Sequence, residues 1–129
     1  MNFKGKLATV ALVGSMAVSG MAATAPSAAA VGGCPSGKLC LYDDPNYAHL
    51  DITSTSTKAC FSLTDWNGFS DGIGSYVNNL PVPVDVYTWT GSVYLYDGRI
   101  RAGGFSSNAG SKFGSRGTVC TGGLTPPGW

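Results

Sequence analysis

Four cysteines have the clearest potential for chemistry in this sequence: Cys34, Cys40, Cys60 and Cys120. An even count favours two disulfides in an exported chain, and the export signal is described below. Of the possible pairings we favour Cys34 with Cys40, because they are close in sequence and flank the turn-forming stretch Pro35-Ser36-Gly37, which leaves Cys60 with Cys120. The alternative is a four-cysteine zinc site, for which the chain lacks a C-x2-C pair.

The sequence contains one pattern of a catalytic nucleophile, and its context is absent. Gly68-Phe69-Ser70-Asp71-Gly72 matches G-x-S-x-G, which needs a strand, a turn and a helix in a larger α/β sheet. The only histidine, His49, has neither a second histidine nor a glutamate to complete a zinc site. Asp43 and Asp44 are adjacent, so on a strand they point to opposite faces. We therefore expect a protein that is not an enzyme.

Aromatic residues could provide a binding face. Tyr87 and Trp89 share one face of a predicted strand, whereas Val82, Val84 and Val86 lie on the other. If the valines are buried, Tyr87 and Trp89 are exposed and form a possible partner-contact surface. Packing within the protein is the alternative role for these rings.

The composition favours strands and turns over helices. The 129 residues include 19 glycines and no glutamate or glutamine, and only 12% are charged. Glutamate and glutamine are strong helix formers, whereas the valine, threonine and tyrosine found here prefer strands. This composition excludes a coiled coil, a Lys/Arg-rich nucleic-acid binder and a long charged disordered tail.

Short β-prone runs recur between turn signals, which is typical of a β-sandwich or barrel. At most, Leu63–Trp66 forms a short helical turn. Leu41-Tyr42-Asp43 recurs as Leu95-Tyr96-Asp97, and two copies of a four-stranded unit would form two Greek keys. The predicted strands span residues 39–43, 49–53, 58–63, 74–78, 82–90, 92–96, 99–102 and 118–121.

The N-terminal segment has the layout of a secretory signal peptide. Lys4 and Lys6 precede an apolar run, Leu7–Val18, that is too short to span a membrane, and small residues end at Ala30. We predict a signal peptide over residues 1–30 and one domain over residues 31–129. Residues 122–129 fit a loose tail, unless Trp129 docks. Acylation of Cys34 as a lipoprotein is the alternative, which would leave an odd number of cysteines to pair.

Cleavage there leaves six basic and seven acidic residues, so net charge directs the mature chain to neither nucleic acid nor an anionic membrane. We expect a secreted, extracellular protein that has no nucleic-acid partner and no membrane association after cleavage, and that is a monomer.

The segment 34–42, CPSGKLCLY, resembles the C-P-x-G-x-x-C-L-[YW] opening of exported actinobacterial proteins of peptidase inhibitor family thirty-six. That family is named for a secreted metalloproteinase inhibitor with a βγ-crystallin-like fold. The resemblance continues through Tyr42-x4-Tyr47-Ala48-His49, the segment 69–79 (FSDGIGSYVNN) and Tyr96-x4-Arg101-Ala102-Gly103, and so covers about residues 34–120. It implies an all-β, βγ-crystallin-like Greek-key sandwich with two disulfides. The crystallin signature is aromatic-x4-aromatic-x-Gly. Gly103 stands at the place of its glycine in the second copy, and His49 stands at that place in the first copy.

Related families often bind Ca²⁺ through [ND]-[ND]-x-x-[ST]-Ser. The corresponding stretch here keeps Asp71 and Ser75 as candidate Ca²⁺ ligands, and the second stretch, residues 114–118, has no acid. Ca²⁺ takes six to eight oxygen ligands, so the resemblance implies weak Ca²⁺ binding or none, and we expect no other cofactor.

The resemblance also implies inhibition of an extracellular peptidase, specifically a metallopeptidase. The founding type carries a second short C-x4-C disulfide loop in its later half, whereas the second cysteine pair here is widely spaced. The loops expected to enter a peptidase cleft span residues 43–48, 54–58 and 79–83, with residues 103–114 as a more mobile candidate. Two other functions stay open: a Ca²⁺-binding structural domain, and a toxin-like or cell-wall-binding exported protein.

Overall fold

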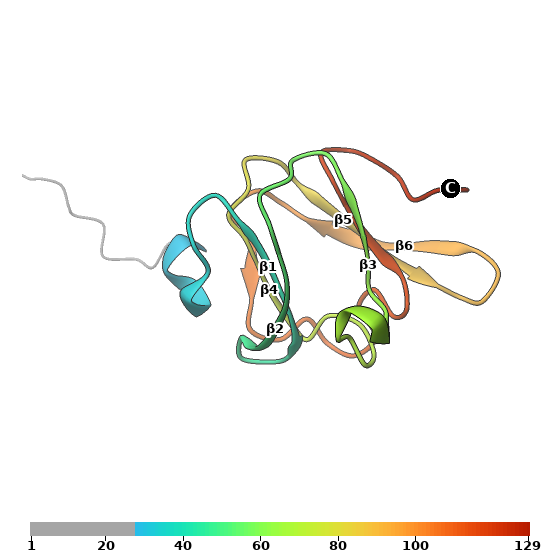
Figure 1. The fold of residues 1–129 in the computed structure, drawn as a ribbon, viewed down its shortest axis with the longest axis horizontal. Coiled ribbons are helices and arrows are strands. Elements are labelled where there is room, and N and C mark those ends of the chain that lie inside the picture. Colours follow the sequence, from blue (N-terminus) through green and yellow to red (C-terminus); the bar gives the residue numbers. More distant parts are fainter. Residues whose placement is uncertain (1–27) are drawn as a thin grey trace, which may run out of the picture.

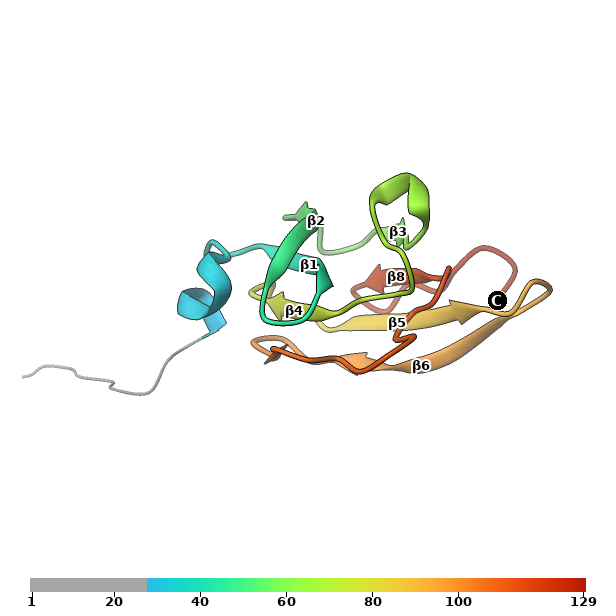
Figure 2. The ribbon, with the colours of Figure 1, turned by 90° about the horizontal axis from the view of Figure 1, so that it is seen from below.

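Two four-stranded antiparallel sheets pack against each other around one apolar core (Figure 1; Figure 2). The computed structural model describes residues 28–129, so most of the predicted signal peptide lies outside the described residues. One sheet has the strand order β2-β1-β4-β7 and the other β3-β8-β5-β6. The strands are β1 (Leu39–Asp44), β2 (Ala48–Ser54), β3 (Cys60–Ser62), β4 (Ser75–Asn78), β5 (Val84–Trp89), β6 (Tyr94–Ile100), β7 (Phe105–Ser106) and β8 (Thr118–Thr121).

The all-β prediction is confirmed. Within residues 28–129 there is no α-helix, and the helical turns are two short 3-10 segments, η2 (Ala28–Gly33) and η3 (Asp65–Asn67). No helix of this described part is long and apolar enough to cross a membrane. The expected helical turn near Trp66 is therefore present, one or two residues later than predicted.

The two halves of the chain exchange one strand. The first half supplies β1, β2 and β4 to one sheet and sends β3 to the other, where it pairs with β8. The second half supplies β5, β6 and β8, and sends β7 to pair with β4. This reciprocal exchange is consistent with the Greek-key, βγ-crystallin-like arrangement that the resemblance implies.

The core lies between the sheets and follows strand alternation. Leu39 and Leu41 in β1 face Val84 and Val86 in β5, and all four are fully buried. Residues two apart share a face of a strand, so each strand contributes a pair to the same core. The other buried members of this cluster are Leu63, Phe69, Ile73, Leu80, Ile100 and Val119.

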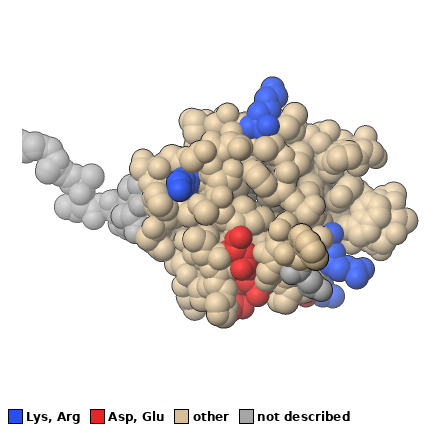
Figure 3. All heavy atoms as spheres, viewed as in Figure 1, with Lys and Arg blue, Asp and Glu red and all other residues tan. Residues whose placement is uncertain are grey.

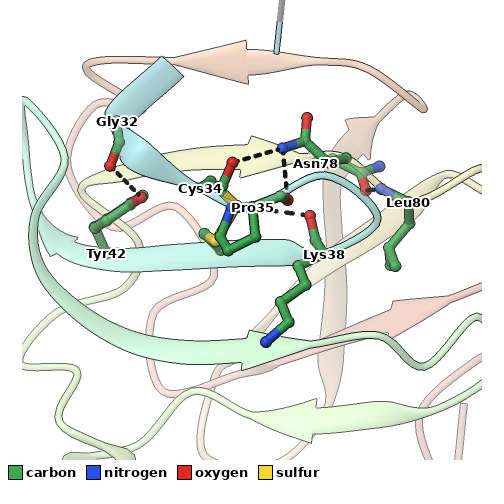
Figure 4. Close-up of a disulfide and its surroundings, with 9 residues drawn as sticks. Gly32, Cys34, Pro35, Lys38, Tyr42, Asn78 and Leu80 are labelled. Carbon is green, nitrogen blue, oxygen red and sulfur yellow. Dashed lines mark hydrogen bonds between the residues drawn. A yellow bond between two sulfur atoms is a disulfide. The ribbon is translucent and has the colours of Figure 1, made fainter. Parts of the chain in front are cut away.

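The Cys34–Cys40 disulfide closes a small second cluster beside η2 (Figure 4). The Tyr42 hydroxyl donates a hydrogen bond to the Gly32 carbonyl at 3.3 Å. The side-chain amide of Asn79 donates to the carbonyls of Cys34 and Pro35, at 3.1 and 3.0 Å. These bonds tie the short disulfide loop to the first sheet.

The second disulfide, Cys60–Cys120, joins β3 to β8 at directly opposed positions. Both disulfides are those favoured from the sequence. In the β1–β2 hairpin the rings of Tyr42 and Tyr47 pack edge to face with centroids 5.6 Å apart, which is consistent with the crystallin-like arrangement. His49 takes the left-handed backbone conformation (φ 59°) that Gly103 takes in the second copy (φ 79°).

One predicted turn is wrong. Asp97-Gly98 was expected to separate two strands, but β6 runs through both residues. The pairing of β5 with β6 shifts register between Val86, opposite Gly98, and Tyr87, opposite Tyr96. Asp97 is therefore the extra residue of a β-bulge, which a dipeptide pattern alone does not distinguish from a turn.

Candidate functional site

The β5–β6 hairpin extends beyond the rest of the second sheet (Figure 1). Its strands pair from Val84 opposite Ile100 to Trp89 opposite Tyr94, and residues 90–93 form the tip. The tip is not among the loops expected from the sequence to contact a partner. Sequence reasoning ended one strand at Thr90 and began the next at Ser92, which left only Gly91 as a turn.

Hydrogen bonds within the tip fix its shape. The Thr90 amide and hydroxyl both donate to the Val93 carbonyl at 3.0 Å, and the Val93 amide donates back to the Thr90 hydroxyl oxygen at 3.1 Å. Gly91 has a φ of 104°, which other residues rarely adopt, so its glycine is required by the turn. The hydrogen bonds of one threonine thus join the two ends of this four-residue tip.

An aromatic pair closes the tip. Trp89 and Tyr94 are directly opposed, with ring centroids 4.8 Å apart, and enclose four residues. Aromatic cross-strand pairs contribute about 0.5–1.5 kcal/mol beyond their burial. The exposed side chain of Val93 (54%) lies beside this closure.

Asp97, the extra residue of the β-bulge, stabilises the stem of the hairpin. The Asp97 carboxylate accepts hydrogen bonds from the Thr88 hydroxyl across the strands and from the Gly114 amide at 2.7 Å. The Trp89 amide donates to the Ser115 carbonyl at 3.1 Å. The loop that precedes β8 therefore holds both strands of the hairpin in place.

The expectation that Tyr87 is an exposed contact residue is wrong, because its side chain is only 3% exposed. The alternation of β5 does turn Tyr87 away from Val84 and Val86, but a second layer covers that face. The Tyr87 ring packs against Tyr96 at 5.5 Å and against Trp129 at 4.9 Å. The C-terminal residue thus docks on the sheet, and burial raises the pKa of Tyr87.

Trp89 is half-buried, and its role in partner contact stays a prediction. It lines a small hollow of about 390 Å³ between the hairpin tip and the C-terminal residues. Of the residues that line this hollow, Val93 and Trp129 are 54% and 57% exposed. Exposed apolar side chains beside a hollow are a feature of protein interaction sites, so they support partner contact as a role for Trp89.

A buried charge supports the base of the hairpin. Asp85, in β5, accepts hydrogen bonds from Arg99 Nε at 2.9 Å, Arg99 Nη2 at 3.1 Å and the Tyr96 hydroxyl at 3.0 Å. The hydrogen bonds from Arg99 hold the pKa of this carboxyl below its usual value, and burial opposes them. Sequence reasoning missed this network, although the positions are paired across adjacent strands.

The two candidate Ca²⁺ ligands serve other contacts. Asp71 is exposed and accepts a hydrogen bond from the Ser115 hydroxyl at 2.8 Å. The buried Ser75 hydroxyl donates to the Asp44 carbonyl at 2.7 Å and accepts from the Tyr47 amide at 2.9 Å. Among the described residues no group of three or more His, Cys, Asp or Glu side chains is placed to hold a metal ion. Ca²⁺ binding stays a prediction.

The residues of the nucleophile-like pattern also have structural contacts. The Ser70 hydroxyl donates to the Asp43 carboxylate at 3.2 Å, and its amide donates to the same oxygen at 2.9 Å. His49 Nδ1 forms a hydrogen bond with the Asp44 carboxylate. The structure therefore ties Ser70 and His49 to different aspartates.

A family model described as Peptidase inhibitor family I36 matches residues 27–101, more than half of the chain. The matched stretch includes both strands and the tip of the β5–β6 hairpin. Comparison with curated proteins and with solved structures finds no match.

Proposed function

The chain belongs to peptidase inhibitor family I36, and on that premise we propose that it inhibits extracellular metallopeptidases by placing the β5–β6 tip in the active-site cleft. The family supports a role in peptidase inhibition rather than catalysis. The choice of metallopeptidases rests on the sequence resemblance. The hairpin is the element of the described structure that best fits the task.

The observation that carries this proposal is the fixed shape of residues 90–93. An inhibitor that presents a rigid loop loses little conformational entropy on binding, which leaves more of the contact energy as affinity. The founding type closes a C-x4-C loop with a disulfide. Here Trp89 and Tyr94 enclose the same number of residues and close the tip by ring packing.

The chemistry of the tip favours an apolar pocket on the partner. Thr90, Gly91, Ser92 and Val93 carry no charge, so the tip offers no basic side chain to a peptidase that selects one by a buried carboxylate. Val93 is the large apolar side chain at the tip and is 54% exposed. We assign it to the specificity pocket of the peptidase.

Export is part of the proposal. Two disulfides suit an oxidising compartment, and Val31 packs on the cluster of the Cys34–Cys40 disulfide. A mature chain that begins at Val31 would keep this packing. Mass spectrometry of the protein recovered outside the cell tests the cleavage site, and a mature N-terminus at a residue other than Val31 would contradict it.

The test of function is a matched pair of variants. Val93→Asp puts a charge at the tip, and Leu50→Asp puts the same charge on a side chain of similar exposure (50%) in β2. We expect Val93→Asp to weaken inhibition of a thermolysin-like metallopeptidase by at least about a hundredfold, or ~2.8 kcal/mol. Leu50→Asp should inhibit like the wild type. Equal inhibition by both variants would remove the hairpin from the mechanism.

A further inference from the structure

A second surface feature lies between the free edges of the two sheets. β2 is the outer strand of one sheet and β3 the outer strand of the other, and they lie on the same side of the molecule (Figure 2). Residues of both strands and of the η3 turn line a groove of about 660 Å³. An outer strand has unpaired backbone N–H and C=O groups, so the groove offers hydrogen bonds from two edges.

Trp66 stands at this groove almost fully in solvent, with 93% of its surface exposed. Two hydrogen bonds of the neighbouring Asn67 fix the turn that carries Trp66. The Asn67 side-chain amide donates to the Ser62 carbonyl at 2.7 Å, and its backbone amide donates to the Thr64 carbonyl at 2.9 Å. A fixed backbone thus presents a large aromatic ring that packs little of its surface on the protein.

Asp51 supplies an uncompensated charge to the same groove. Its Oδ2 is buried and has no hydrogen-bond partner, and within residues 28–129 its carboxylate forms no ion pair. Gly68, at φ 91°, lies directly against the carboxylate, where any Cβ would collide with it. Burial raises the pKa of Asp51, Asp43 adds to this increase, and His49 opposes it.

The charge of the surroundings points to a cationic ligand. The groove lining contains one carboxylate and no lysine or arginine. On the face shown in Figure 3, acidic side chains gather in one strip, and Lys and Arg lie apart from it. The lining residues are Asp51, Ile52, Thr53, Ser54, Cys60, Phe61, Ser62, Thr64, Trp66 and Asn67.

We propose that this groove binds an extended peptide segment that carries a lysine or arginine. The peptide backbone adds to the free edge of β2, a recurrent mode of peptide recognition. Its cationic side chain lies over the Trp66 ring and pairs with the Asp51 carboxylate. Free strand edges favour an extended peptide over a sugar, because only the peptide carries backbone N–H and C=O groups at the spacing of a strand.

This site is separate from the β5–β6 hairpin, since the two share no residue. The probe is a capped pentapeptide, Ac-Thr-Val-Arg-Val-Thr-NH2, titrated calorimetrically into the disulfide-bonded exported protein. The matched probe replaces arginine with citrulline, which keeps the shape and removes the charge. We expect the arginine peptide to bind at least about tenfold more tightly.

The protein variants assign the contacts. Asp51→Asn should abolish the preference for arginine over citrulline, and Trp66→Ala should weaken both peptides. The matched controls are Asp71→Asn and Trp129→Ala, an exposed carboxylate and a half-exposed tryptophan outside the groove, and both should bind like the wild type. Circular dichroism of each variant verifies its fold.

Three results would overturn the proposal. The first is no binding of the arginine peptide at millimolar concentration. The second is equal binding of the arginine and citrulline peptides by the wild type. The third is binding of a neutral chito-oligosaccharide that depends on Trp66 while the arginine peptide does not bind, which would assign the groove to glycans. Val93→Asp should leave peptide binding unchanged, so failure of the inhibitory proposal and failure of this one are distinguishable.

Discussion

Asp85 links the stability of the hairpin base to pH. Its pKa is lowered in the folded protein by hydrogen bonds from Arg99, so ionised Asp85 stabilises the fold above its unfolded-state pKa, near 4. That stability is lost as the pH falls through the lower folded-state pKa. We expect Asp85→Asn to be less stable than the wild type at pH 7 and to lose less stability between about pH 4 and 2.

Urea unfolding midpoints over that pH range provide the measurement for Asp85. Asp71→Asn is the control, because it removes a carboxylate that is exposed. Parallel pH profiles for Asp85→Asn and the wild type would show that Asp85 contributes nothing through its ionisation.

The contribution of Asp51 to stability has the opposite pH dependence. Its pKa is raised by burial and by Asp43, so its folded-state pKa lies above the unfolded value. The associated stability is present below the unfolded pKa and is lost as the pH rises through the folded one. We expect Asp51→Asn to melt at a higher temperature than the wild type at pH 7, with a gain that shrinks in acid. A lower melting temperature at pH 7 would contradict this assignment.

At the residue scale, the spacing of the cysteines predicted the disulfides correctly, whereas strand alternation did not predict that Tyr87 is buried. The pairing of Cys34 with Cys40 follows from their short separation and the turn between them. The burial of Tyr87 could not be predicted, because it depends on Trp129, which is distant in sequence and packs on the outer face of β5. The same holds for Asp85 and Arg99, which face each other only once the hairpin register is known.

At the scale of the element, the closure of the hairpin tip is the feature to test. Tyr94→Ala removes one ring of the pair with Trp89 and should weaken inhibition about tenfold, or ~1.4 kcal/mol, by loosening residues 90–93. Directly opposed residues on antiparallel strands lie about 4.5–5.5 Å apart at Cα, within the range that a disulfide spans. The double variant Trp89→Cys with Tyr94→Cys should therefore restore inhibition when oxidised.

The inhibition constants of this series, measured with and without a reducing agent, give the answer. Reduction should weaken the double-cysteine variant and leave the wild-type tip unchanged under conditions that spare the native disulfides. Inhibition by Tyr94→Ala equal to that of the wild type would show that the ring pair is not needed.

Alternating valines and turn residues predicted β5 and β8 within two residues of the observed ends. Two elements were beyond such patterns. β6 continues through Asp97-Gly98 because a bulge absorbs the extra residue, and β7 is only two residues long. A strand of that length has too few residues for alternation to be visible.

At the scale of the molecule, the two disulfides should differ in their effect on stability. Cys60–Cys120 closes a loop with a sequence separation of 60, whereas Cys34–Cys40 has a separation of 6. The chain-entropy model gives about 4 kcal/mol for the long loop and about 2 kcal/mol for the short one. Double Cys→Ala variants compared by urea unfolding check this order, and a greater loss from the short loop would reverse the account.

The two-sheet architecture was predictable because strand-like runs dominate the chain and a short motif repeats in its two halves. The exchange of β3 and β7 between the sheets was not predictable from composition, since it depends on long-range pairing. That exchange leaves β5 and β6 as the long hairpin at one side of the second sheet (Figure 1).

The central claim is that this fold presents an inhibitory hairpin to a metallopeptidase. The most direct measurement is a titration of the oxidised, exported protein against a thermolysin-like metallopeptidase, with a subtilisin-like serine peptidase in parallel. The account predicts stoichiometric inhibition of the metallopeptidase and little effect on the serine peptidase. Full activity of the metallopeptidase at micromolar concentrations of the protein would contradict it.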